Sequence, residues 1–152
     1  MKAVPSQGVA SDVFAQRHAK ELVAALSLAE QCIYLAPDGS MRSYAKTAGF
    51  LRSSGESPEF RDRRVLALYE VSTPQDVHYP TWEMHPQGDE LLIVASGALA
   101  VEFRDSGAGQ KTLLLPRSAI VVPAGVWHRL IVNERSVLIA ITPRQDTVHG
   151  NM

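Results

Sequence analysis

Four side chains that can bind a metal ion or move a proton lie in two short segments of the second half of the chain. Glu83 and His85 are two residues apart, and Glu90 follows them after a Pro-, Gly- and Asp-containing turn. Residues two apart in a β-strand point to the same face, so two adjacent strands can bring these three side chains together. His128 follows a Pro-x-Gly turn and opens another apolar segment, and it can be a fourth ligand if its face looks inward. Imidazole nitrogens and carboxylate oxygens that converge on one point suit a divalent transition metal.

The spacing of these residues resembles the two sequence motifs of the cupin superfamily. In the first motif, a His-x-His unit is followed by a glutamate after three or four residues and by a glycine after six more. His85 matches the second histidine, Glu90 follows it after four residues, and Gly97 follows Glu90 after six. The second motif contains a Pro-x-Gly unit, two further residues and a histidine, which the segment from Pro123 to His128 matches.

Three positions depart from the family pattern within residues 64–142, the part of the chain that resembles it. Glu83 replaces the first histidine, Arg117 replaces the glycine that opens the second motif, and Asn133 lies one residue later than the motif's asparagine. The second and third departures concern turns and loops. The first departure changes the implied ligand set.

Glu83 leaves two ligand sets open. If it binds metal, then Glu83, His85, Glu90 and His128 form an anionic set that favours Fe, Mn, Ni or Zn over Cu(I). If it does not, the other three form the two-histidine, one-carboxylate set of non-haem iron oxygenases, and Glu83 orients His85 or acts as a base. A cupin that has lost its metal is the third alternative. Without a cation the two carboxylates would repel each other, and one would take up a proton near neutral pH.

Short apolar or alternating segments, separated by Gly, Pro, Asn or Asp, follow one another from Arg64 onward. Such regular spacing predicts an all-β sandwich or barrel rather than βαβ units. The resemblance implies a jelly-roll β-barrel of the kind found in small single-domain bacterial cupins. The eight predicted strands are Arg64–Val71, Thr81–His85, Leu91–Ala95, Ala98–Phe103, Thr112–Leu115, Ala119–Val122, Trp127–Val132 and Val137–Ile141.

The N-terminal third has a different texture. Apolar spacing and alanine content predict a helix over Val13–Leu28, and an apolar run predicts a short strand over Cys32–Leu35. After a turn, we expect a surface excursion with one helical turn near Tyr44–Leu51. We therefore expect a single domain in which an N-terminal extension, residues 1–63, packs on a barrel formed by residues 64–152.

Composition excludes several classes of protein. The 152 residues contain 15 Lys and Arg against 16 Asp and Glu, and one cysteine. One cysteine cannot form an internal disulfide, and the charge balance argues against a nucleic-acid or membrane-surface binder. No apolar run approaches the roughly 20 residues that span a bilayer. We expect a cytoplasmic protein whose partner is a small molecule and whose exposed sheet edges favour a homodimer.

Several other residues that can do chemistry have simpler explanations. We expect His18, His78 and His149 to be exposed to solvent. Arg129 can meet an anionic substrate, but a single arginine is more often solvated. Cys32 lies in an apolar run and is expected to be a buried small hydrophobic residue.

Two functions fit these expectations. The first is a metal-dependent enzyme that acts on a small polar molecule inside the barrel, with Glu83 as the candidate catalytic base. Dioxygenases, isomerases and decarboxylases all occur on this fold, and the fold does not choose among them. The second is a non-catalytic module that binds a small ligand.

Overall fold

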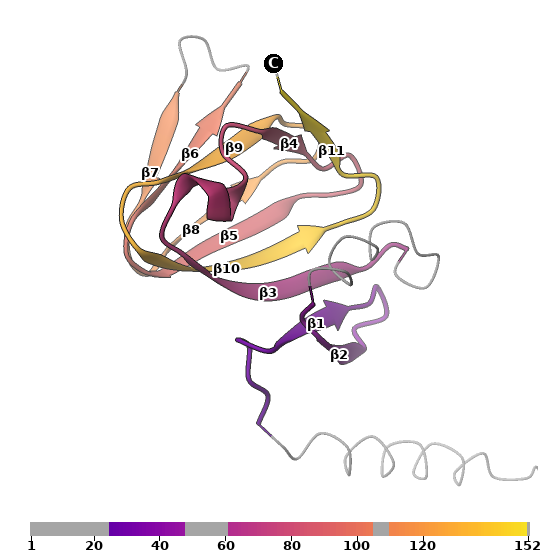
Figure 1. Ribbon diagram of the computed structural model, residues 1–152. Coiled ribbons are helices and arrows are strands. Elements are labelled where there is room, and N and C mark those ends of the chain that lie inside the picture. The colour runs from indigo at the N-terminus through magenta and orange to yellow at the C-terminus, as the bar shows by residue number, and fades with distance from the viewer. Residues whose placement is uncertain (1–24, 48–60, 105–109, 152) are drawn as a thin grey trace, which may run out of the picture.

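The computed structural model describes residues 25–47, 61–104 and 110–151. These residues form two antiparallel β-sheets that face each other, which confirms the predicted all-β jelly roll (Figure 1). One sheet has six strands in the order β2-β1-β3-β10-β5-β8, and the other has five in the order β11-β4-β9-β6-β7. The strands are β1 (Gln31–Leu35), β2 (Met41–Ala45), β3 (Arg64–Val71), β4 (Trp82–Met84), β5 (Glu90–Ser96), β6 (Leu99–Phe103), β7 (Lys111–Leu114), β8 (Ser118–Val122), β9 (His128–Val132), β10 (Ser136–Pro143) and β11 (Val148–Gly150).

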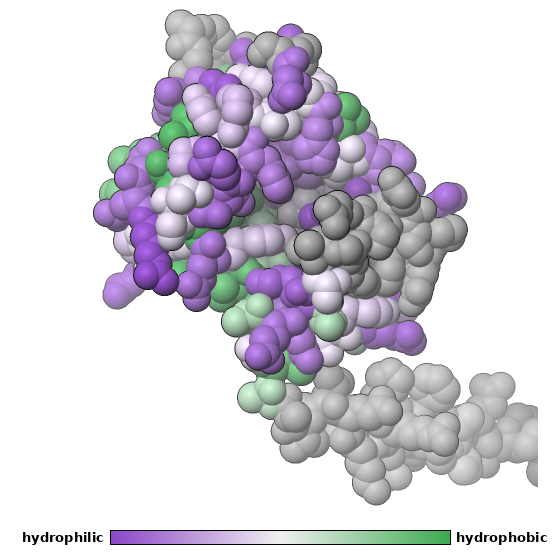
Figure 2. Space-filling view, in the orientation of Figure 1, coloured by the Kyte–Doolittle hydropathy of each residue, from purple (hydrophilic) through white to green (hydrophobic). Residues whose placement is uncertain are grey.

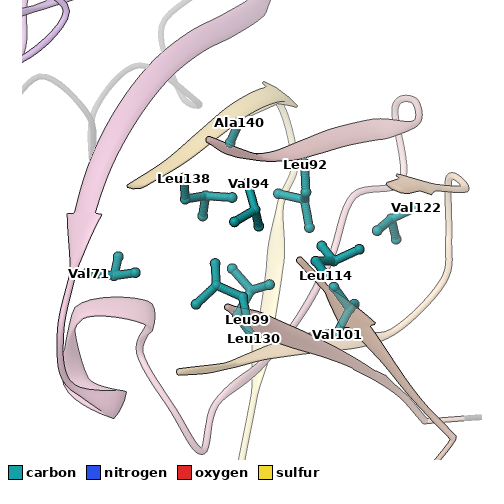
Figure 3. Close-up of a cluster of buried hydrophobic side chains, with 10 residues drawn as sticks. All are labelled: Val71, Leu92, Val94, Leu99, Val101, Leu114, Val122, Leu130, Leu138 and Ala140. Carbon is teal, nitrogen blue, oxygen red and sulfur yellow. The ribbon is translucent and has the colours of Figure 1, made fainter. Parts of the chain in front are cut away.

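A core of aliphatic side chains fills the space between the two sheets. The alternation of each strand points every second residue inward, so the sheets contribute leucines and valines from both sides (Figure 3). Burying one such side chain contributes roughly 1.5–3 kcal/mol relative to leaving it exposed. The cluster consists of Val71, Leu92, Val94, Leu99, Val101, Leu114, Val122, Leu130, Leu138 and Ala140.

The eight strands predicted from Arg64 onward are all present, with ends that differ from the predicted ones by two residues at most. Two strands were not predicted. In β2 the five residues are half-buried or exposed, because β2 lies at a sheet edge, and its sequence has no clear alternation. β11 has only three residues and forms by pairing with β4. Both depend on a partner strand, which local sequence patterns do not reveal.

The predictions for the N-terminal third have mixed outcomes. The predicted strand over Cys32–Leu35 is confirmed as β1. The predicted helical turn near Tyr44–Leu51 is wrong at its start, because residues 44–45 belong to β2, and its end lies outside the described residues. The predicted helix over Val13–Leu28 also lies mostly outside them, and its described end, residues 25–28, is not helical. Within the part that the structure describes, no helix is long and apolar enough to span a membrane.

The β1–β2 hairpin extends the larger sheet. β1 pairs with β3, and Cys32 and Tyr34 form a second buried cluster with Val65 and Ala67. The predicted burial of Cys32 is confirmed, and this burial raises the pKa of its thiol. The ammonium group of Lys46, just beyond β2, donates a hydrogen bond of 2.5 Å to the carbonyl of Leu68 in β3. The hairpin is therefore held to the barrel both by sheet pairing and by buried side chains.

Gly97 and Arg117 show what the backbone requires at two turns. Gly97 has a φ of +80°, and a Cβ atom there would lie 2.3 Å from the carbonyl oxygen of Arg135. Only glycine fits this position, which explains its place in the motif. Arg117, where the family pattern has glycine, also has a positive φ of 67°. This left-handed backbone conformation is unfavourable for arginine, as for most residues other than glycine.

Candidate metal centre

The structure brings together all four residues that the sequence singled out. Glu83 lies in β4, His85 follows this strand directly, Glu90 begins β5, and His128 begins β9. Glu83 and His128 are direct partners across the β4–β9 pair, so their side chains share the inward face. One nitrogen or oxygen atom from each of the four residues lies within 4.8 Å of those of the others, which is a spacing that could hold one metal ion.

The two motif turns dock onto each other and hold the site together. The backbone N–H of Gly125 donates a hydrogen bond of 2.9 Å to the carbonyl of His85. The N–H of Ala124 donates one of 2.9 Å to Oδ1 of Asp89, which immediately precedes Glu90. Each turn thus positions a ligand of the other motif, and the Pro-x-Gly sequence supplies the tight bend that this contact requires.

Hydrogen bonds on the far side of both imidazole rings decide which nitrogen faces the site. Nδ1 of His128 lies 3.2 Å from the carbonyl oxygen of Val126, which can only accept, so Nδ1 carries the proton. Nδ1 of His85 lies 3.0 Å from the hydroxyl of Thr147, and that hydroxyl donates to the carbonyl of Arg144 at 3.1 Å. The hydroxyl therefore accepts from Nδ1 of His85. Both rings present Nε2 to the centre, which is the arrangement found in metal-binding histidines.

A carboxylate oxygen occupies the centre opposite these two nitrogens. Oε2 of Glu90 lies 3.0 Å from Nε2 of His128 and 3.5 Å from Nε2 of His85. The other oxygen of Glu90 accepts a hydrogen bond of 2.6 Å from the hydroxyl of Thr142. Among the described residues, Nε2 of His85 is buried without a hydrogen-bond partner. Nitrogen lone pairs that face a buried carboxylate require a positive charge between them, either a proton or a metal ion.

Glu90 and His128 shift each other's pKa values in opposite directions. Burial alone would raise the pKa of Glu90, but His128 and His85 outweigh it and lower that pKa to about 2. Burial would lower the pKa of His128, but Glu90 outweighs it and raises that pKa. Both shifts favour the charged forms, the carboxylate of Glu90 and the imidazolium of His128, and therefore argue against Glu90 as the carboxylate that takes up a proton in a metal-free site. A divalent cation would replace the proton of the imidazolium on binding.

Glu83 has a different environment from Glu90. Its side chain is 30% exposed, against 4% for Glu90. Its Oε1 atom lies 3.6 Å from Nε2 of His128, and its Oε2 atom lies 4.0 Å from Nε2 of His85. Glu83 therefore lies between the buried centre and the space in front of it.

That space is a cavity of about 130 Å³ between the two sheets. Its inner wall is apolar, and its mouth is polar. On the molecular face that carries the mouth, hydrophilic residues surround a depression (Figure 2). The short 3₁₀-helix η2 (Pro74–Val77), in the connection between β3 and β4, contributes to the mouth. The lining includes Tyr69, Asp76, His78, Arg144, Thr147 and His149 at the polar side and Leu92, Leu130, Leu138 and Ala140 at the apolar side.

The sequence analysis gave no site role to several of the polar lining residues, among them His149 and Arg144. His149 is half exposed, as expected, but β11 places it directly opposite Glu83, with its Nε2 atom 3.7 Å from Oε2 of Glu83. The carboxylate of Glu83 raises the pKa of His149. Arg144 follows β10 and also lines the cavity. Arg144 could have been predicted to face the cavity from its position two residues after the inward-facing Thr142. His78 is exposed, as expected, and lies at the mouth.

Arg129 is neither solvated nor close to the cavity. Its Nε atom donates a hydrogen bond of 2.6 Å to Oε2 of Glu102, its partner across the β6–β9 pair. Its guanidinium lies 4.3 Å from the ring centre of Trp82 and 4.8 Å from that of Tyr79. These contacts lie on the outer face of the smaller sheet, since Leu130 and Val101 face the core. They hold the segment before β4, and with it Glu83, against the sheet.

Comparisons with known proteins find one matching family model and several similar proteins. Residues 70–142 match the family model described as a cupin domain. The uncharacterized protein YdbB of Bacillus subtilis is 31% identical over 64 residues, which are 42% of this chain and 54% of YdbB. The match thus spans about half of that relative. A cupin-2 domain containing protein from Shewanella frigidimarina is 28% identical, with a TM-score of 0.43 over 53% of this chain and 70% of its own. Hydroxypropylphosphonic acid epoxidase from S. wedmorenis is 16% identical, with a TM-score of 0.46 over 80% of this chain and 60% of its own.

Proposed function

Residues 70–142 of this chain match a cupin domain, and from this premise we propose that the protein binds a divalent transition metal and acts on a small polar molecule. His85, Glu90 and His128 are the proposed ligands. The observation that carries the proposal is the pair of Nε2 atoms, each fixed by a hydrogen bond on the far side of its ring and aimed at one buried carboxylate oxygen. Fe, Mn, Ni and Zn all suit such a nitrogen and oxygen set.

The chemistry of a site of this kind follows from its open side. A bound divalent ion supplies Lewis-acid or redox chemistry at the inner end of the cavity. Glu83 is the proposed base, because it lies beside the ligands, remains partly exposed and faces the cavity. Its carboxylate can accept a proton from a bound molecule at either oxygen, and His149 lies next to Oε2 to stabilise the carboxylate. The apolar wall excludes water from the non-polar part of that molecule.

Elemental analysis tests the metal proposal. The protein is expressed in medium supplemented with Fe, Mn, Ni and Zn, purified, and analysed by plasma mass spectrometry. We expect about one ion of one of these metals per chain, and protein that holds no stoichiometric metal would overturn the proposal. The Glu70→Gln variant is a control that should hold as much metal as the wild-type protein. Glu70 is exposed at the surface and pairs only with Arg135 among the described residues.

The Glu83→Gln variant tests the role of Glu83. If Glu83 is a base rather than a ligand, the variant keeps its metal, and the metal dissociation constant rises by no more than about 10- to 100-fold, as for a residue next to the ligands. Turnover of any substrate found in a screen should fall by about 10²-fold or more. Retained turnover in this variant would remove Glu83 from the mechanism. A metal-loaded protein that binds small molecules without converting them would instead be a binding module.

We also propose that the chain forms a homodimer. In the described part of the larger sheet, β2 and β8 are the edge strands, and an edge presents backbone groups that a second copy can pair. Light scattering at micromolar concentration tests this, and a monomer would overturn it. The cytoplasmic location stays a prediction from the sequence.

A further inference from the structure

The outer face of the larger sheet is aliphatic across neighbouring strands. Along β3, β10, β5 and β8, the residues between the core positions point away from the smaller sheet. The strand register places these outward residues opposite one another, so they form two rows that run across the sheet. Ile33 of β1 extends the first row, because it pairs with Leu66. The first row continues with Leu66, Ile141, Leu91 and Val121, and the second consists of Leu68, Ile139, Ile93 and Ala119.

The outer face of the smaller sheet differs from this aliphatic face. There Glu102 pairs with Arg129 on one neighbouring strand at 2.6 Å and with Lys111 on the other at 3.8 Å. An antiparallel sheet with one face in water carries polar residues on that face, whereas strands buried on both faces read as continuous apolar runs. Residues 91–95 and residues 137–141 are such runs. The larger sheet therefore has the sequence of a sheet that is covered on both sides.

The described part of the chain covers only the inner side of this sheet. Every described strand belongs to one of the two sheets, and η2 packs against β9 (Figure 1). No described strand or helix is left to lie over the two rows. Their side chains are half-buried by one another, except that Ala119 and Val121 at the edge are exposed.

The size of the two rows fits the centre of a dimer interface. With strands about 4.8 Å apart, the first row spans roughly 20 Å from Ile33 to Val121. Together the two rows form an apolar patch of roughly 300–500 Å², a size that marks interaction sites on soluble proteins. A stable interface buries about 800 Å² of each partner, with an apolar, charge-poor centre inside a polar rim.

The charges around the rows favour a second copy of this chain as the partner. Arg64 and Glu70 lie towards the two ends of β3, on either side of Leu66 and Leu68. A two-fold axis that crosses the strands would reverse their direction, so Arg64 would face Glu70 of the partner subunit while the uncharged rows meet. A two-fold interface requires such a self-complementary patch. The formal net charge of −1 per chain adds little repulsion between two copies.

From these observations we propose that two copies of the chain pack through the outer faces of their larger sheets. The inference rests on the homodimer proposed above, and it assigns the interface to the two aliphatic rows rather than to pairing at the edge strands. Two such sheets interdigitate their side chains at a separation of about 10 Å, with strand directions within about 30° of each other.

Three glutamate substitutions in the full chain test this interface. Sedimentation velocity over a dilution series gives the dimer dissociation constant of each protein. Ile139 lies at the centre of the rows, between Leu68 and Ile93, and Ile139→Glu should raise the constant at least about 30-fold. Val121→Glu at the end of a row should raise it about three- to tenfold. Leu113→Glu on the smaller sheet is the matched control, since Leu113 is 55% exposed and Val121 56%. Its constant should stay within about twofold of wild type.

The outcomes separate this inference from the proposed function. A dimer whose dissociation constant changes in neither Ile139→Glu nor Val121→Glu would overturn the inference and leave dimerisation to the sheet edges. Val121→Glu decides alone if Ile139→Glu does not fold by circular dichroism. A wild-type chain that is monomeric at micromolar concentration would overturn both the homodimer and this interface, and the face would then have another occupant. Elemental analysis of the same samples tests the metal centre independently, because its ligands lie on the inner side of the sheet.

Discussion

The two ends of the space between the sheets are built from the same strands but from different side chains. At one end the inward residues are polar and converge on the metal centre, and at the other they are aliphatic and form the core. On each strand, the inward residues change from polar to aliphatic between one inward position and the next. The paired positions are Glu90 and Leu92 on β5, His128 and Leu130 on β9, and Thr142 and Ala140 on β10. One sheet architecture thus carries a binding end and a stabilising end that differ only in which inward residues each strand supplies.

The two ends obey different energetic rules. Aliphatic side chains gain from burial alone, because they leave water without losing hydrogen bonds. Buried carboxylates and imidazoles require a partner for every polar atom. At the metal end Thr142, Thr147 and the carbonyl of Val126 are three of these partners, and the proposed cation would be the fourth. Substitutions at the metal end should therefore change metal affinity, and substitutions at the core end should change stability.

The largest expected effect is that of Glu90→Gln. The amide keeps the size and the contact with Thr142 but loses the negative charge at the centre. The metal dissociation constant should rise about 1,000-fold, which corresponds to about 4 kcal/mol. The thermal midpoint in the presence of a chelator should change little, because the amide can donate to Nε2 of His128. Competition with a chromophoric chelator measures the affinity, and a loss of less than tenfold would show that Glu90 is not a ligand.

Leu99→Ala tests the opposite end. Leu99 is fully buried in β6, so removing its side chain should lower the free energy of unfolding by roughly 2–5 kcal/mol. Leu113 in the neighbouring strand β7 is 55% exposed, and Leu113→Ala should change stability by no more than about 0.5 kcal/mol. Urea unfolding measures both. The metal affinity of the folded Leu99→Ala protein should stay within about twofold of wild type, and a larger change would mean that the ends are coupled.

Gly97 and Gly125 show how tightly the backbone turns are packed at the two ends. Gly97, between β5 and β6 at the core end, has a φ of +80°, and a Cβ there would collide with Arg135 and Ser136, where β10 begins. Gly125, in the turn at the metal end, has a φ of +78° but no atom within 4 Å of such a Cβ. Gly97→Ala should cost about 2–3 kcal/mol from strain and overpacking, and Gly125→Ala about 1 kcal/mol from strain alone. Equal losses in urea unfolding would contradict the role assigned to the close contact at Gly97.

The same contrast explains what could be predicted from the sequence. The eight strands from Arg64 onward depend on local alternation and on turn residues, and the sequence displays both. The meeting of Glu83, His85, Glu90 and His128 follows from motif spacing. By contrast, β11 with His149 forms through pairing with β4, and its three residues carry no pattern. Arg129 was expected to be solvated, but Glu102 on the paired strand and the rings of Tyr79 and Trp82 surround it. All three residues are distant from Arg129 in sequence.

Thr142→Val tests the support of the metal end. The valine keeps the shape of the side chain but removes the hydroxyl that donates to Oε1 of Glu90. Loss of such a supporting hydrogen bond typically weakens metal binding 10- to 100-fold, and we expect a rise of about tenfold in the dissociation constant. Chelator competition measures it, and an unchanged constant would show that Glu90 is held by the ion alone. Thr112→Val in β7, distant from the centre in the sheet order, is the control.

The smallest expected effect concerns Asp76 at the mouth. The backbone N–H groups of Ser72 and Thr73 lower the pKa of its carboxyl group. A depressed pKa contributes stability that is present above the unfolded pKa, roughly 3.9, and that is lost as the pH falls through the folded value. The urea midpoint of wild type should therefore exceed that of Asp76→Asn at pH 6, and the difference should shrink towards pH 3. A difference that grows on acidification would contradict this role. Because Asp76 is exposed, solvent screens its contribution, and the binding end should depend far less on this carboxylate than on the buried one of Glu90.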